Sequence, residues 1–178
     1  MTENSPAAMM DSLTDPEPLA DRDDVDYRER THHVDADEFP AVRDDLGDTA
    51  GWAVVGVVNG AGRILLMDDG SHGWTLPAVP VASGGDWVAA AEGVVESLTG
   101  ATPGIGRPER VRRVDYRENG GGGHVIVHHV VLPAAPVAGD PVADDPTVGC
   151  DTAVAVDWVD ALPDELEGAV AEDARLFL

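Results

Sequence analysis

The chain has 178 residues, of which 43% are hydrophobic, and this suits one globular domain with a flanking segment. The formal net charge is −23, and all eleven basic residues are arginine. Such a charge repels itself in dilute buffer and is screened by concentrated salt, so the composition is typical of a halophile's cytoplasmic protein. It excludes non-specific nucleic-acid binding, which needs clustered cations, and no stretch approaches the ~20 apolar residues of a membrane span.

Three regions follow from composition along the chain. Residues 1–34 are acidic and poor in large apolar side chains, so we expect a disordered tail. Residues 35–50 predict a short helical lead-in, and residues 51–178 the main domain. The single cysteine, Cys150, excludes an internal disulfide and is expected to be a small, buried or half-buried residue.

Hydrophobic periodicity in the main domain predicts hairpins around one inserted helix. The β-branched run 52–58 precedes Asn59-Gly60, the strongest short hairpin signal, and a returning strand at 63–67. Residues 71–85, which contain Gly, Pro and Ser, predict a long loop. Further strands are predicted at 111–118, 124–132 and 153–159, and helices at 35–47, at 86–98 and from Pro163 onward. This order predicts an α/β (α+β) fold with a mixed sheet between helices.

Residues 52–178 resemble a Nudix domain in the order of four segments. The first is the strand and NG turn that lead into RILLM. GWTLPAVPV at 73–81 is similar to the family's W-x-L-P-G-G-x-V segment, and SLTG at 97–100 to the close of its signature. AVDWVDALPDEL at 155–166 is similar to the late W-V-x-x-x-x-L-P segment. The resemblance implies the Nudix α/β/α sandwich, and a homodimer is compatible with it.

The carboxylates of the family signature, G-x5-E-x7-R-E-U-x-E-E-x-G-U (U, bulky aliphatic), are absent. With its last glycine at Gly100, the glutamate positions fall on Gly85, Val94, Ser97 and Leu98. In the family these glutamates hold Mg²⁺ or Mn²⁺, and hard cations need oxygen ligands. The resemblance therefore implies that hydrolysis is weak or lost and that no metal site is expected.

Other carboxylates lie on or near the predicted 86–98 helix or the 111–118 strand and are possible replacements for the missing glutamates. Glu92 and Glu96 lie on the opposite side of the helix from position 94, which favours a solvated face. Asp86 lies beside the first lost glutamate, although a helix N-cap is its more ordinary role. If hydrolysis survives, Mg²⁺ or Mn²⁺ would need ligands outside the signature, and the candidates are Asp86, Asp115, Glu118 and Glu109.

Arginines and tryptophans are the candidate ligand-binding residues. Strand alternation places Arg113 and Arg117 on one face and Arg110 and Arg112 on the other, and either pair could clamp a phosphate. Neutralisation of acidic surface is the alternative. Trp52 and Trp74 could stack a base, with packing in the core as the alternative. The residues expected to bind a ligand are Arg63, Trp74, Arg113 and Arg117.

Histidines and glycines on the same hairpin favour structural roles. His124 and His128 share a face and His129 points away, so a third metal ligand is not evident. The run Gly120 to Gly123 lacks the Lys-Ser/Thr of a phosphate loop and predicts a flexible hairpin tip.

Three functions remain open from the sequence. The first is a diverged Nudix-type domain that binds a nucleotide or a nucleoside-diphosphate-linked ligand. The second is an active metal-dependent hydrolase of such compounds. The third is a regulatory or protein-interaction module without a small ligand.

Overall fold

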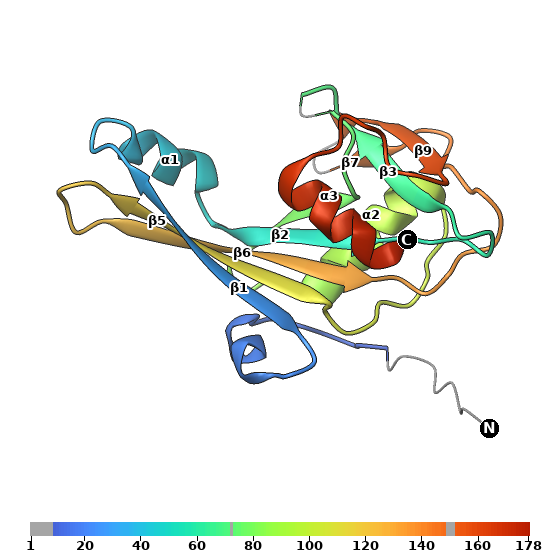
Figure 1. Ribbon diagram of the computed structural model, residues 1–178, viewed down its shortest axis with the longest axis horizontal. Coiled ribbons are helices and arrows are strands. Elements are labelled where there is room, and N and C mark those ends of the chain that lie inside the picture. The colour runs from blue at the N-terminus through green and yellow to red at the C-terminus, as the bar shows by residue number, and fades with distance from the viewer. Residues whose placement is uncertain (1–8, 72, 149–151) are drawn as a thin grey trace.

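The computed structural model describes residues 9–71, 73–148 and 152–178, so the expectations for residues 1–8 and Cys150 lie outside the described residues. It is a mixed α+β fold (Figure 1). In chain order the elements are η1 (Glu17–Asp21), β1 (Asp26–Val34), α1 (Phe39–Leu46), β2 (Thr49–Gly56), β3 (Ile64–Asp68), β4 (Ala78–Ala82), α2 (Trp87–Thr99), β5 (Arg110–Glu118), β6 (His124–Pro133), β7 (Thr147–Val148), β8 (Thr152–Ala153), β9 (Ala155–Val159), α3 (Gly168–Ala174) and η2 (Arg175–Phe177). No helix in these ranges is long and apolar enough to cross a bilayer.

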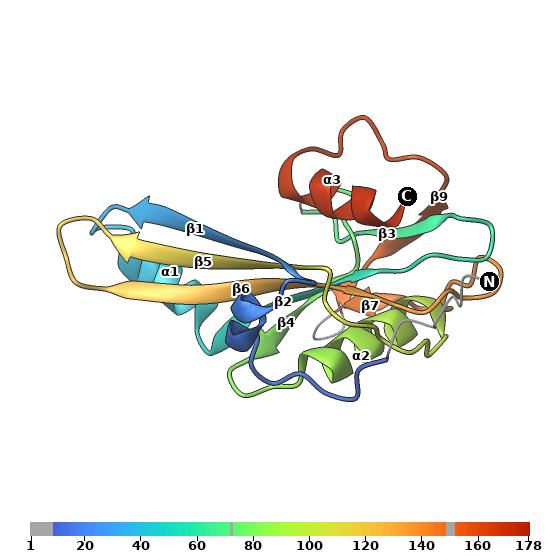
Figure 2. The same cartoon turned by 60° about the horizontal axis from the view of Figure 1, so that its bottom comes forward.

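A five-stranded mixed sheet is the centre of the fold. Its order is β1-β5-β6-β2-β4, with β1 parallel to β5 and β2 parallel to β6, whereas the β5–β6 and β2–β4 pairs are antiparallel. Figure 2 shows α3 above this sheet and α2 below it, while β1, β5 and β6 extend beyond both helices as an arm. The predicted fold class, a mixed sheet between helices, is confirmed.

Each face of the sheet carries its own hydrophobic core. On the α2 face, alternate residues of β2 such as Ala53 and Val55 pack with Val95 and Leu98 of the helix, all fully buried. On the other face, a smaller core of Ile64, Leu66, Leu76 and Ala174 lies beneath α3, with Val54, Trp74 and Phe177 packed against it. This second core holds α3 over one end of the sheet.

The N-terminal segment differs from the predicted disordered tail. Residues 26–34 form β1, which pairs in parallel with β5 over nine positions. Upstream, Leu19 and Val25 are buried, and the backbone of Leu13 bonds to Trp87, whose N–H donates to the Leu13 carbonyl at 2.7 Å. Composition predicted disorder because it counts local apolar groups, whereas this segment is ordered by partners that are distant in sequence.

The two strands on either side of the NG turn, β2 and β3, belong to different sheets. The turn itself forms as predicted, with a bridge between Val58 and Ile64 and an N–H to C=O bond from Leu65 to Val57 at 3.0 Å. However, β3 then pairs with β9 in a separate two-stranded sheet, and β2 pairs with β4 and β6. The predicted loop at 71–85 is wrong in its second half, because residues 78–82 form β4. Pro80 obscured this strand, and it is tolerated because β4 is an edge.

The helices follow local signals at most of their ends. The helix α2 has Asp86 as its N-cap and Gly100, at φ +78°, as its left-handed C-cap, close to the predicted 86–98. The helix α1 ends at Gly47 as predicted, but its N-cap is Glu38 rather than Asp35 or Asp37. The final helix begins at Gly168 and not at Pro163, because residues 163–166 form a turn closed by a 3.0 Å backbone bond.

One glycine fixes the position of Trp52 on the sheet. Gly51 has φ +154° beside a shift of register between β2 and β4. A Cβ at this residue would lie 1.8 Å from the His128 carbonyl oxygen on β6. Only glycine permits so close an approach of the two backbones, and the next residue, Trp52, is thereby set opposite His129.

Candidate functional site

A groove of about 700 Å³ opens on the sheet face that carries α3. Its floor is formed by side chains of the five central strands, and α3 closes one end with Ala169, Val170 and Asp173. The segment that follows β3 contributes Asp69 and Trp74. The other lining residues are Arg30, His32, Trp52, Val54, Met67, Thr75, Leu76, Ala78, Pro80, Arg112, Val114, Tyr116, His129, Val148 and Thr152.

Strand register brings a row of planar side chains together on the floor. Trp52 is opposite His129, and His129 is opposite Arg112, so three neighbouring strands contribute adjacent groups. The indole and the imidazole are stacked, with centroids 5.2 Å apart and an interplanar angle of 25°. Burial, assisted by the charge of Arg112, lowers the pKa of His129, so this imidazole is neutral near pH 7. A further planar ring would extend this stack on the outer face of one of the two rings.

A second stacked pair lies farther along the arm. His32 and Tyr116 are register partners on β1 and β5, with ring centroids 5.4 Å apart and an angle of 22°. Between the two pairs, Arg30 is opposite Val114. Arg30 is exposed, and it forms no ion pair within the described ranges of the chain. The floor therefore alternates ring surfaces with a cationic centre.

Ion pairs join α3 to the strands at the end of the groove that this helix closes. Asp173 is buried and accepts from Arg110 at 2.8 Å and from Arg112 at 2.5 Å. Glu172 accepts from Arg28 at 3.0 Å and from Arg112 at 3.3 Å. The five side chains form one network in which two carboxylates on α3 neutralise arginines on β1 and β5.

One donor in this network is left without an acceptor. Arg112 is only 4% exposed, and its Nε finds no hydrogen-bond partner within the described part of the chain. A buried guanidinium N–H without a partner costs free energy, about 1–3 kcal/mol for a neutral group and more for a charged one. Arg112 also lines the groove, and although Nε itself is covered, an acceptor atom of a bound ligand would remove that cost if the side chains around Nε moved aside.

Of the ligand-binding candidates, Trp74 lies in the groove and the three arginines do not. Arg63 pairs with Asp140 at 2.7 Å and with Asp160 at 3.1 Å.

The other two arginine candidates lie on the opposite face of the sheet, as the alternation predicted. Arg113 lies 3.7 Å from Glu17, and Arg117 pairs with Asp115 at 2.8 Å. These ion pairs fit the alternative role given above, in which the arginines neutralise acidic surface.

The catalytic candidates are separated and have structural contacts. Asp86 accepts the N–H groups of Val88 at 2.9 Å, Ala89 at 3.4 Å and Leu13 at 3.0 Å. Burial alone would raise the pKa of Asp86, but hydrogen bonds from Leu13, the Ser12 side chain, Val88 and Ala89 together lower it.

Asp115 and Glu118 point to opposite faces of β5. Asp115 is 3% exposed; besides Arg117, it lies near His124, whose Nδ1 is 3.5 Å from Oδ1. Glu118 lies at the β5–β6 tip, and Glu109 is exposed.

Two of the three α2 positions where the family signature has glutamates are filled by core residues. Val94 is 4% exposed and Leu98 is fully buried against the sheet, while Ser97 faces solvent. Glu92 and Glu96 are exposed on the outer side of α2, as the helical geometry predicted. Within the described ranges, no group of three or more His, Cys, Asp or Glu side chains is placed to hold a metal ion.

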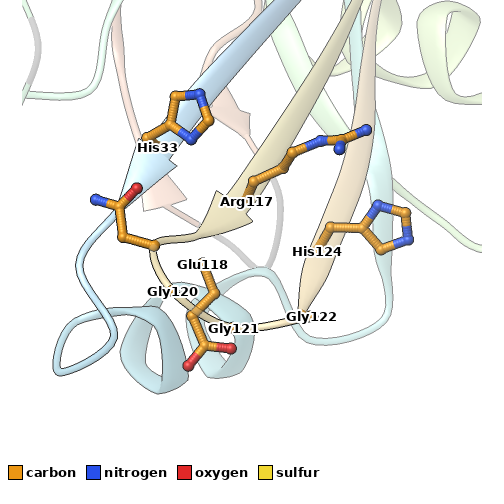
Figure 3. Close-up of a pocket in the computed structure, with 9 residues that line it drawn as sticks. His33, Arg117, Glu118, Gly120, Gly121, Gly122 and His124 are labelled. Carbon is orange, nitrogen blue, oxygen red and sulfur yellow. The ribbon is translucent and has the colours of Figure 1, made fainter.

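A second cavity, of about 490 Å³, lies at the β5–β6 hairpin tip (Figure 3). It is formed by the glycine run together with His33, Arg117, Glu118, Asn119 and His124. Figure 3 shows Glu118 pointing to the side opposite Arg117 and His124. The glycines form the predicted hairpin tip, and the contact with α1 explains one of them: a Cβ on Gly123 would lie 2.8 Å from Phe39. This cavity presents glycine backbone and no stacked ring pair.

Sequence reasoning missed most of the groove. Arg30 and His32 lie on a strand that was expected to be disordered. Arg112 and His129 were placed on the correct face of each strand, yet neither was chosen as a ligand-binding residue. The signal that could have found them is the alternation of side chains along the strands. On β5 and β6 this alternation places polar or aromatic groups on the sheet face that α3 covers only in part.

Comparison with known proteins leaves this geometry as the basis for function. No protein-family model matches the chain, and no curated protein sequence is similar to it.

Proposed function

We propose that the protein binds a nucleotide-like ligand in the groove, as a diverged Nudix-type domain in which hydrolysis is weak or lost. The ring of the ligand would lie against the Trp52–His129 pair, and its phosphate would accept from Arg112, with Arg30 nearby. The observation that carries the proposal is the buried, unpartnered Nε of Arg112 beside a stacked aromatic pair. The order of the elements around the mixed sheet is compatible with the Nudix resemblance.

Ring stacking and guanidinium contacts are complementary parts of nucleotide recognition. Stacking of a base on an aromatic side chain is worth about 1–3 kcal/mol and tolerates different bases. A guanidinium donates in a fixed planar geometry that matches phosphate oxygens. A nucleic-acid polymer is disfavoured, because the chain's −23 charge would repel a long phosphate backbone.

Loss of hydrolysis is proposed on the composition of α2. Two signature positions, Val94 and Leu98, are occupied by buried aliphatic side chains that bind no cation. Asp86, the carboxylate next to signature position 85, already accepts three backbone N–H groups. Without clustered carboxylates among the residues that the structure describes, these residues offer a divalent ion no site from which to activate water.

The test is calorimetric titration of the full chain with AMP in about 1 M KCl, which screens surface repulsion. We expect saturable binding that Trp52→Leu weakens by about tenfold or more, given the stacking energy. Trp52→Phe should restore most of the affinity, because it keeps a ring on the floor. Tyr27→Leu, on the opposite face of β1, is the matched control and should leave the affinity unchanged.

Phosphate release with and without EDTA separates binding from hydrolysis. Turnover of nucleoside diphosphate derivatives that needs Mg²⁺ or Mn²⁺ would overturn the loss of hydrolysis. Absence of any AMP binding, or binding that Trp52→Leu leaves intact, would overturn the groove as the nucleotide site.

A further inference from the structure

The charge of the groove is set by the network that joins α3 to the sheet. Three arginines in the network, Arg28, Arg110 and Arg112, face Asp26, Glu172 and Asp173. The three positive and three negative charges cancel. Arg30, on the floor beside them, adds one positive charge.

The carboxylates of α3 occupy the places that phosphate oxygens would otherwise take. Asp173 uses both oxygens, one on Nη1 of Arg110 and the other on Nη1 of Arg112. Glu172 accepts from Nη2 of Arg112. Among the described residues that line the groove, the arginines are Arg30 and Arg112, and Arg112 is already paired with both carboxylates. One exposed guanidinium and one that is largely neutralised match a single phosphate group better than a chain of three.

We infer that Glu172 and Asp173 are specificity-determining residues that restrict the groove to ligands with a single phosphate group, such as a nucleoside monophosphate or a phosphodiester. The inference rests on the proposed nucleotide site, and it specifies in addition how many phosphate groups the ligand carries. Each further phosphate would bring negative charge toward these carboxylates, of which Asp173 is buried at the groove on a helix held by the core that contains Ala174. Like charges within a few ångströms repel strongly where water is partly excluded.

The experiment compares AMP with ATP, titrated without divalent cations into the full chain, its Glu172→Gln and Asp173→Asn variants, and Glu165→Gln as control. Glu165 is an exposed carboxylate in the turn before α3. In about 0.5 M KCl, wild type should bind AMP about tenfold more tightly than ATP, from the repulsion of unit charges at this separation. Both variants should raise the affinity for ATP about tenfold and that for AMP by much less. Glu165→Gln should change neither.

The readout is the ratio of the two affinities, which a general loss of structure would not shift toward ATP. Glu172 is 42% exposed at its side chain, so its variant tests the inference even if Asp173→Asn does not fold. Equal affinities in wild type, or a ratio unchanged by Glu172→Gln, would overturn the inference while AMP binding still supported the proposed site. If AMP does not bind at all, the proposed function fails together with it.

Discussion

At the scale of single residues, burial decides the protonation state of two histidines on β6. His128 is 7% exposed, and its Nε2 lacks a hydrogen bond within the described residues. Burial lowers its pKa, opposed by Glu17 and Asp15 and assisted by Arg113. His129, its neighbour on the other face, is also neutral because burial lowers its pKa. Both histidines are therefore protonated at a lower pH in the folded state than in the unfolded chain.

The pH dependence of stability follows with a definite sign. A histidine whose folded pKa lies below the unfolded value near 6.5 contributes stability above that pH and loses it as the pH falls. We expect His128→Gln to lose less stability than wild type between pH 7.5 and 5.5, by at most about 1.4 kcal/mol per pH unit below 6.5. Denaturant unfolding at both pH values measures this, with the exposed His33→Gln as control. A parallel loss in wild type and His128→Gln would contradict the assignment.

At the scale of elements, one carboxylate connects a helix end to a distant segment. Asp86 caps α2 through Val88 and Ala89 and also accepts the N–H of Leu13, 73 residues earlier. The sequence predicted the cap from residue type and position. The contact with Leu13 appears only when the N-terminal segment is packed beside α2, so the residue stabilises two parts of the chain.

Removal of this cap should cost stability and loosen the N-terminal segment together. Asp86→Ala is expected to lower the free energy of unfolding by about 1–2 kcal/mol, the range for a lost N-cap. Asp86→Asn keeps an acceptor oxygen and should cost much less. Hydrogen exchange at the Leu13 amide should be faster in Asp86→Ala than in Asp86→Asn. Unchanged exchange in both would show that Asp86 does not hold the segment.

At the scale of the whole molecule, a strongly charged surface surrounds two small cores. Among the described residues, the exposed large hydrophobic side chains are Met9, Val142, Leu176 and Leu178. The arginines are largely used in ion pairs, as with Arg22 and Asp24 at 2.9 Å. Most acidic side chains thus remain as an excess of negative charge, which opposes folding unless salt screens it.

We therefore expect the melting temperature to rise by several degrees between about 0.1 M and 2 M KCl, as the screening length shortens from about 10 Å to below 3 Å. A matched variant replaces four exposed acids, Asp44, Asp45, Asp144 and Asp145, with Asn. It should melt at a higher temperature in low salt and respond less to added KCl. Equal salt responses in the two proteins would show that repulsion among surface acids does not limit stability.

Signals carried by neighbouring residues were sufficient for part of the fold. The α2 helix could be predicted because its periodicity, its cap at Asp86 and its stop at Gly100 act within a few residues of each other. The β5–β6 hairpin was evident from alternation around a glycine run. Alternation also separated Arg113 and Arg117 from Arg110 and Arg112. These features yield the α+β class and a mixed sheet between helices.

The tertiary structure alone decided the strand partners and, with them, the groove. Nothing local shows that residues 26–34 pair with β5, or that β3 pairs with β9. The stacking of Trp52 on His129 depends on the register of strands about 75 residues apart in sequence. The docking of Asp173 on Arg112 depends on how α3 lies over the sheet. Such contacts form between distant segments, and their geometry follows from the packing of whole layers and not from the pattern within one segment.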